Sequence, residues 1–241
     1  MRTSRLFTEQ VLSSGQSLLL SKKSSHYLNK VLRLREGSVL RLFNGRDGEF
    51  LARLAKIAKH EVEVEIAERL IEPKLGSLKI DLYLGLSKGD RMDYGIQKST
   101  ELGVASITPF YSQHGGVKLK AERVESRLLH WQQIAVSASE QCGRLDVPII
   151  NEPLQLSKWL GSSQSSVTVV IDPNGEANLS DLPTSNSINL LVGPEGGFAE
   201  EELLAAKNNG CTIAVLGSRI LRTETAPIAA LAILQHLYGD L

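Results

Sequence analysis

The chain lacks the features that define several large classes of protein. Its two cysteines, Cys142 and Cys211, are too few for a disulfide framework, and no zinc-ligand spacing occurs. No apolar run approaches the roughly 18 residues that cross a bilayer, and no signal-peptide core follows the first residues. These absences argue against a disulfide-rich secreted domain, a zinc protein and a helical membrane protein. We therefore expect a cytoplasmic protein with no metal site and no membrane partner.

Two nucleotide-binding motifs are also missing. The segment Gly193-Pro194-Glu195-Gly196 does not supply the G-x-G-x-x-G pattern of dinucleotide-binding turns, and no G-K-[ST] string of a P-loop occurs. The missing motifs weaken the hypothesis of a nucleotide-dependent oxidoreductase, which stays open as an alternative.

Two glycine-rich segments near the C-terminus are the most informative part of the chain. Residues 191–198 read LVGPEGGF, and residues 216–226 read LGSRILRTETA. Each follows an apolar run of strand length and precedes a helical pattern, which predicts two turns at the carboxyl ends of strands. Open α/β sheets bind ligands at that edge, and glycine lets the backbone approach a flat ligand closely. The residues alone indicate a ligand-binding edge, although either turn could also be purely structural.

Charge is unevenly distributed along a chain whose formal net charge is zero. Residues 1–60 contain 12 Lys and Arg against 4 Asp and Glu, whereas the remainder is acidic. Such asymmetry indicates a module that faces a polyanion, and the alternative is a solvated basic surface without a partner.

The first seventy residues read mostly as short strands. Residues 38–43 alternate and end at the tight-turn signal Asn44-Gly45, and residues 49–57 and 61–66 follow as partner strands. One short helix interrupts them, with Ser24 or Ser25 as its expected N-cap. This pattern predicts a small β-barrel.

Beyond residue 77, strands and helices alternate. Strands are expected at residues 79–85, 106–110, 167–171, 189–192 and 212–216, and helices at residues 91–102, 121–142, 199–209 and 225–238. This alternation predicts an α/β fold with a mostly parallel sheet that is covered on both faces.

The two glycine-rich segments together resemble the signature segments of the RsmE family. The likeness extends over nearly the whole chain and includes KGDRM at 88–92, TELGV at 100–104 and EQCGR at 140–144. RsmE proteins are SPOUT-class methyltransferases that methylate N3 of a uridine in the 16S ribosomal RNA of the small subunit. The resemblance implies a PUA-like β-barrel at residues 1–72 and a SPOUT methyltransferase domain at residues 73–241. It also implies a trefoil knot, which no local pattern predicts, S-adenosylmethionine as cofactor, and a homodimer.

In the RsmE family the knot builds the cofactor pocket, which implies a set of cofactor-binding residues in this chain. They are Leu191, Val192, Gly193, Pro194, Glu195, Gly196, Gly197, Leu216, Gly217, Ile220, Leu221, Arg222 and Thr223. The strand at residues 167–171, with Asp172 and Pro173 after it, is expected to supply a third side.

Methylation of N3 requires a uracil to lose its N3 proton. A cation could stabilise the charge on the base oxygens, and Arg222 is the first candidate for this role, with Arg91 the second. Glu224 or Glu195 could accept the proton as general base. The alternative for the arginines is a structural ion pair, in which Arg219 or Arg222 binds Glu224.

The basic first module is expected to bind RNA through phosphate contacts, which add affinity rather than sequence specificity. The candidate residues are Arg2, Arg5, Lys22, Lys23, Lys30, Arg33 and Arg35. Three functional alternatives stay open: a SPOUT methyltransferase with a different target base, the oxidoreductase, and an RNA-binding protein without catalytic activity.

Overall fold

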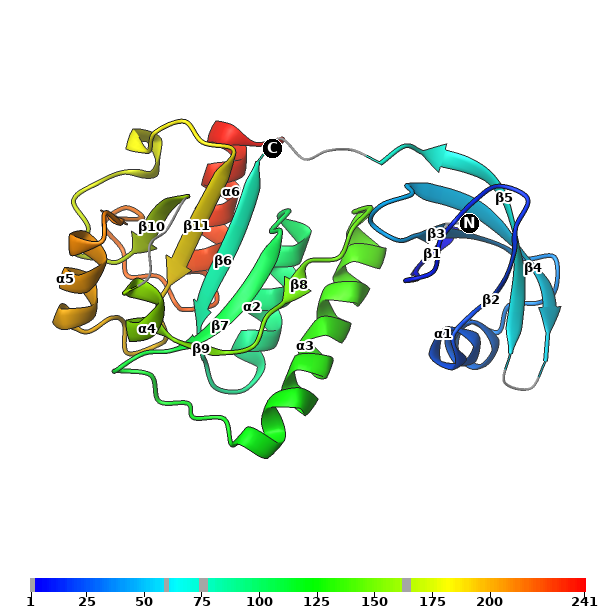
Figure 1. The fold of residues 1–241 in the computed structure, drawn as a ribbon, viewed down its shortest axis with the longest axis horizontal. Coiled ribbons are helices and arrows are strands. Elements are labelled where there is room, and N and C mark those ends of the chain that lie inside the picture. The colour runs from blue at the N-terminus through cyan, green and yellow to red at the C-terminus, as the bar shows by residue number, and fades with distance from the viewer. Residues whose placement is uncertain (1–2, 59–60, 74–77, 162–165) are drawn as a thin grey trace. The chain divides into compact units, whose positions relative to one another are not determined.

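The computed structural model describes residues 3–58, 61–73, 78–161 and 166–241, and Arg2 lies outside these ranges. The chain forms two compact units, Met1–Leu75 with Ser139–Val147, and Gly76–Ala138 with Pro148–Leu241. Each unit is described below by itself, and the helices and strands carry the labels of Figure 1.

The first unit is built on one five-stranded sheet in the order β1-β3-β4-β5-β2. Its strands are β1 (Ser4–Phe7), β2 (Ser17–Leu19), β3 (Val39–Phe43), β4 (Glu49–Ile57) and β5 (Val62–Ile71). The pair β1–β3 is parallel, and the other pairs are antiparallel. Alternate side chains of these strands form the core of the unit, which includes Leu6, Leu18, Leu40, Leu42, Phe50, Leu54, Val64 and Ile66.

The short helix of this unit begins earlier than the sequence pattern predicts. Helix α1 (Lys22–His26) has Ser21 as its N-cap, because the Ser21 side chain accepts a hydrogen bond from the backbone N–H of Ser24. The expectation of Ser24 or Ser25 at this position was wrong. Ser25 is instead buried, and its hydroxyl donates to the carbonyl of Leu20.

Helix α1 continues into a π-helical turn (Tyr27–Val31), which ends just before a strained residue. Arg33 has a φ of 51°, and within the described ranges no other residue except glycine has a positive φ. Such a left-handed conformation is uncommon for a residue with a Cβ atom. It turns the chain sharply before β3.

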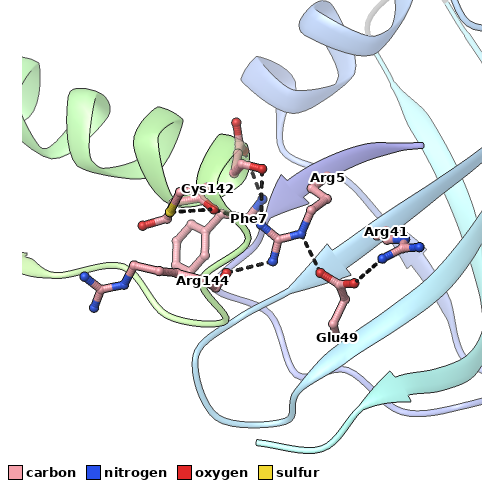
Figure 2. Close-up of polar contacts among 8 residues, drawn as sticks. Arg5, Phe7, Arg41, Glu49, Cys142 and Arg144 are labelled. Atoms are coloured by element: carbon pink, nitrogen blue, oxygen red, sulfur yellow. Dashed lines mark hydrogen bonds and ion pairs between the residues drawn. The ribbon is translucent and has the colours of Figure 1, made fainter. Parts of the chain in front are cut away.

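Residues 139–147 belong to the first unit although they lie far along the chain, and Arg5 is one residue that joins them to β1. The Arg5 guanidinium donates to the carbonyls of Ser139 (2.8 Å), Glu140 (3.1 Å) and Arg144 (2.7 Å). Its Nε atom also lies 2.5 Å from Oε2 of the buried Glu49. Figure 2 shows this arginine reaching from β1 to both sets of partners.

The second unit contains an entirely parallel sheet, whose strands follow the order β12-β10-β11-β6-β7-β8 with β9 beside β7. The strands are β6 (Lys79–Gly85), β7 (Ser106–Tyr111), β8 (Ile149–Ile150), β9 (Leu154–Gln155), β10 (Val167–Ile171), β11 (Ser187–Val192) and β12 (Thr212–Ala214). The helices are α2 (Asp90–Glu101), α3 (Ala121–Cys142), α4 (Leu156–Leu160), α5 (Glu200–Asn208) and α6 (Ala226–Tyr238), and a 3₁₀ turn spans Leu179–Asp181.

Helices cover both faces of this sheet. The neighbouring residues Tyr83 and Leu84 of β6 point to opposite faces because side chains alternate along a strand. Tyr83 packs on Trp159 of α4 with ring centroids 4.4 Å apart, whereas Leu84 lies against Gly95 of α2. Both faces of the central strands are therefore buried, and in β11 every residue from Ile188 to Val192 is buried.

Candidate active site

A cleft with a volume of about 430 Å³ opens in the second unit at the carboxyl ends of β10, β11 and β12. Ile171, Val192 and Val215 lie in its wall where these three strands end. Its volume falls within the roughly 300–1,000 Å³ that is usual for small-molecule sites. The predicted ligand-binding edge of the sheet is therefore an open cleft.

The segments after β10, β11 and β12 surround the cleft, whereas the end of β6 is closed against the segment after β11. A Cβ atom on Gly85, the last residue of β6, would lie 2.3 Å from the nitrogen of Pro194. Strand β6 continues to its neighbour β7, whereas β11 leads through α5 to β12 beyond β10. The strand order therefore changes direction between β6 and β11, and ligands of open α/β sheets bind near such a point.

The first glycine-rich segment forms one wall of the cleft. Gly193 leaves room for the ring of Phe198, since a Cβ atom on Gly193 would lie 3.0 Å from that ring. Gly197 has a φ of 69°, a conformation that glycine adopts without strain. The Phe198 ring lies against Phe110 with centroids 6.0 Å apart, which fixes the wall to the core.

The second glycine-rich segment forms the facing wall. Leu216, Ile220 and Leu221 supply apolar side chains to the cleft, and Ile220 is 83% exposed. A large exposed isoleucine beside a cleft indicates an apolar surface that a ligand would cover. The backbone leading out of the segment is held firmly, since Thr225 and Ala226 each donate a hydrogen bond to the carbonyl of Arg222 at 2.9 Å.

A charged network joins three separate segments at the cleft. Nη1 of Arg91 lies 2.7 Å from Oε1 of Glu195, and Nε of Arg91 lies 3.9 Å from Oε2 of Glu224. The backbone N–H of Lys88 also donates to Glu195 (3.3 Å), and the Thr223 hydroxyl donates to Glu224 (3.2 Å). Arg91 at the start of α2 thus holds two carboxylates from the two glycine-rich segments near one another.

The network keeps Glu195 ionised. Partial burial acts to raise the pKa of Glu195, but hydrogen bonds from its own backbone N–H, from Arg91 and from Lys88 outweigh it, so the pKa is lowered. A carboxylate with a lowered pKa is a weak proton acceptor at neutral pH. Of the two predicted bases, Glu195 is therefore poorly suited to accept a proton.

Two arginines line the cleft with free guanidinium groups. Arg219 and Arg222 are both exposed, and within the described ranges neither has an ion-pair partner. The structural alternative, in which one of them binds Glu224, is not what the structure shows, because Arg91 occupies that carboxylate. Both cations are available to a ligand.

Most of the predicted cofactor residues line the cleft, together with Arg91 and Glu224. Those that line it are Val192, Gly193, Pro194, Glu195, Gly197, Leu216, Gly217, Ile220, Leu221, Arg222 and Thr223, and the expected third side, Ile171, Asp172 and Pro173, is also present. Leu191 is placed elsewhere because strand alternation turns it into the core with Phe110 and Ala206. Gly196 faces His114, whose carbonyl oxygen would lie 2.6 Å from a Cβ atom on this glycine.

Three lining residues were not predicted: Phe198, Val215 and Ala226. Phe198 carried a usable signal, because an aromatic residue directly after Gly197 in a ligand-binding turn is a candidate wall. Val215 and Ala226 carried none, since small apolar residues at strand and helix ends are typical of any core.

The predicted RNA-contact residues divide into exposed and internal groups. Those exposed on the first unit are Lys22, Lys23, Lys30, Arg33 and Arg35. The side chain of Arg5 is only 11% exposed, and its guanidinium lies over the Phe43 ring at 4.4 Å besides donating to Glu49 and three carbonyls. A phosphate contact does not fit this placement, so Arg5 has a structural role.

Within the described ranges, no cluster of three or more His, Cys, Asp and Glu side chains is arranged to hold a metal ion. None of the described helices combines the length and apolar character needed to cross a membrane.

Comparisons with known proteins agree on one family. Residues 74–235 match a family described as an RNA methyltransferase domain, and residues 20–67 match one described as an RNA methyltransferase PUA domain. Ribosomal RNA small subunit methyltransferase E of Buchnera aphidicola subsp. Schizaphis graminum is 36% identical, over 100% of this chain and 98% of that protein.

Two solved structures are similar over their full lengths. A methyltransferase from Legionella pneumophila, solved with bound SAM, has a TM-score of 0.95 and is 37% identical over 100% of both chains. Ribosomal RNA small subunit methyltransferase E of Neisseria gonorrhoeae, bound to S-adenosyl methionine, has a TM-score of 0.92 and is 38% identical over 100% of both chains.

Proposed function

Because the chain belongs to the ribosomal RNA small subunit methyltransferase E family, we propose that it methylates N3 of one uridine in 16S ribosomal RNA with S-adenosylmethionine. The observation that carries this proposal is the convergence of both glycine-rich segments on one cleft, beside free arginines and an Arg91–Glu224 pair. Relatives solved with this cofactor support the same assignment.

The residues of the cleft fit the cofactor. Leu216, Ile220 and Val192 offer apolar surface for an adenine. The backbone of the first glycine-rich segment, around Gly193 and Gly197, offers close approach and hydrogen-bonding groups. The sulfonium of the bound cofactor supplies an electrophilic methyl carbon. The carboxylates of Glu195 and Asp172 both line the cleft and suit the positively charged parts of the cofactor.

The chain must make N3 of uracil nucleophilic. The N3 proton has a pKa roughly two units above neutral, so its removal at neutral pH costs on the order of 3 kcal/mol. Arg222 lowers this cost by placing its unpaired guanidinium against the base oxygens, where charge develops. Preorganisation favours this role, because the backbone of Arg222 is held at the start of α6.

Glu224 takes the N3 proton, and N3 takes the methyl group. Glu224 accepts the N3 proton while the carbon–sulfur bond breaks and the nitrogen–carbon bond forms, which leaves a neutral thioether. Two residues position Glu224: Arg91 through an ion pair and Thr223 through a hydrogen bond from its hydroxyl. N3 is engaged in any base pair, so the target uracil must leave its stack before it reaches the cleft.

Methyl transfer from radiolabelled S-adenosylmethionine tests the proposal. The acceptors are small subunits and free 16S RNA from a strain without this activity, and the product nucleoside is identified by mass spectrometry. We expect incorporation at one site, as 3-methyluridine. Incorporation at a different base would indicate another RNA methyltransferase, and no incorporation with retained RNA binding would indicate a non-catalytic RNA-binding protein.

Calorimetric titration separates the oxidoreductase alternative. We expect S-adenosylmethionine to bind and NAD not to bind. Tight binding of NAD with no binding of S-adenosylmethionine would remove the methyltransferase assignment.

We also propose that the protein is a homodimer that works in the cytoplasm. On α6, Ile233 and Leu237 are 41% and 42% exposed, which is apolar surface suited to a second copy. Sedimentation equilibrium should give twice the chain mass of 26.3 kDa, and a mass of one chain would contradict the proposal. The trefoil knot implied by the resemblance stays a prediction.

A further inference from the structure

A second cavity, of about 190 Å³, lies in the second unit beside the turn between β6 and α2. Ser87 and Lys88 line it from this turn, Met92 lines it from the start of α2, and Trp131 and Arg127 line it from α3. It is smaller than the roughly 300–1,000 Å³ of ordinary small-molecule sites. Its size suits a single flat group such as one nucleotide base.

Trp131 lines the cavity, and its indole N–H is buried without a hydrogen-bond partner among the described residues. The residue is 3% exposed. A buried donor without an acceptor costs about 1–3 kcal/mol, so such groups are rare in folded proteins. The indole ring forms part of the apolar lining of the cavity, whereas its N–H is not accessible from the cavity.

The rim of the cavity is positively charged. Lys88 and Arg127 are both exposed, and among the described residues neither side chain has an ion-pair partner. Met92 is 2% exposed and adds an apolar surface below them. An apolar interior with a cationic rim matches a base attached to a phosphate.

The turn connects this cavity to the candidate active site. Gly89 has a φ of 62°, which allows the chain to turn sharply into α2. The backbone N–H of Lys88 binds Glu195 of the cleft, while Arg91 and Met92, adjacent in sequence, line the cleft and the cavity respectively. Residues 88–92 therefore connect the cavity to the cleft.

We propose that this cavity receives the base of a nucleotide beside the target uridine, with its phosphate at Lys88 and Arg127. The inference rests on the proposed function, because it requires a single-stranded RNA substrate. It adds a second recognition point close to the reacting base, and it assigns Trp131 and Arg127 to substrate binding.

Tryptophan fluorescence tests the cavity directly, because the chain has two tryptophans. In the full-length Trp159→Phe variant, emission comes from Trp131 alone, and Trp159 lies outside both cavities. We expect a short oligouridylate to change this emission saturably, and uridine monophosphate to do so more weakly. An unchanged emission at concentrations that saturate methyl transfer would overturn the proposal.

The salt dependence of binding tests the rim. Each phosphate contact on a single strand contributes about 0.7 to the slope of log K against log salt concentration. Arg127→Ala should lower the slope for the oligouridylate by about this amount, whereas Arg123→Ala, one turn earlier on α3 and outside the cavity lining, should not. Equal slopes for both variants would contradict the assignment. If the full-length chain binds the oligouridylate with the expected emission change but transfers no methyl group to RNA, the result would count against the proposed function and still support the cavity.

Discussion

At the scale of single residues, Arg222 combines a fixed backbone with a free side chain. We expect Arg222→Ala to lower turnover by about 10²–10³, the usual loss when one preorganised charge-stabilising donor is removed. The affinity for S-adenosylmethionine should change little, because the side chain acts on the base. Single-turnover methyl transfer and calorimetry measure the two quantities. Arg219→Ala, an exposed arginine of the same cleft, is the matched control and should retain most of its turnover.

Two glutamates should affect stability with opposite dependence on pH. The pKa of Glu195 is lowered in the folded state, so its contribution is present above the unfolded pKa and is lost as pH falls through the folded pKa. Burial raises the pKa of Glu140 despite hydrogen bonding from Phe7 and the charge of Arg5, so its ionisation destabilises the fold as pH rises through that range.

Conservative variants separate the two effects. Relative to the wild type, Glu195→Gln should be less stable at neutral pH, and Glu140→Gln should be more stable. Both differences should shrink as the pH falls into the range where the wild-type carboxyls are protonated. Urea unfolding measured across pH tests this, and differences that do not vary with pH would contradict it.

Among secondary-structure elements, the contact between β1 and the end of α3 depends on one arginine. Arg5→Ala leaves the buried Glu49 carboxylate without its main partner, and breaking a buried pair costs about 3–5 kcal/mol. Arg41 is the other partner of Glu49, but its side chain is 41% exposed, so Arg41→Ala should cost only about 0–1 kcal/mol. Chemical unfolding compares the two variants. Equal losses would show that Arg5 does not anchor residues 139–147.

The turn between β11 and α5 gives a second prediction at this scale. A valine at Gly196 would collide with the His114 carbonyl, so Gly196→Val should displace the turn and weaken S-adenosylmethionine binding. Gly161→Ala is the control, because a Cβ atom there makes only ordinary contacts, at 3.6 Å. Calorimetry tests both variants. Wild-type affinity in Gly196→Val would place the cofactor away from this turn.

The sequence predicted the long elements well and their details less well. Strand β4 and helix α3 have the expected bounds because alternation and helical periodicity are strong over many residues. The N-cap of α1 was misplaced, because the three serines at 21, 24 and 25 can all cap a helix and the pattern alone does not distinguish them. The two-residue strands β8 and β9 are too short to leave a periodic signal.

At the scale of the whole molecule, long-range contacts were beyond the sequence pattern. The basic surplus of residues 1–60 predicts a module that faces a polyanion, but charge counting could not distinguish Arg5, which is internal, from the exposed Lys22 and Arg33. Likewise, residues 139–147 join the first unit through contacts more than a hundred residues apart in sequence. Motif spacing located most of the cleft, whereas the Arg91–Glu224 pair depends on how three segments fold together.

Mass spectrometry of 16S ribosomal RNA from a deletion strain of the source organism tests the central claim most directly. The account predicts that one 3-methyluridine disappears on deletion, returns with the wild-type chain and does not return with Arg222→Ala. An unchanged content of 3-methyluridine in the deletion strain would contradict it.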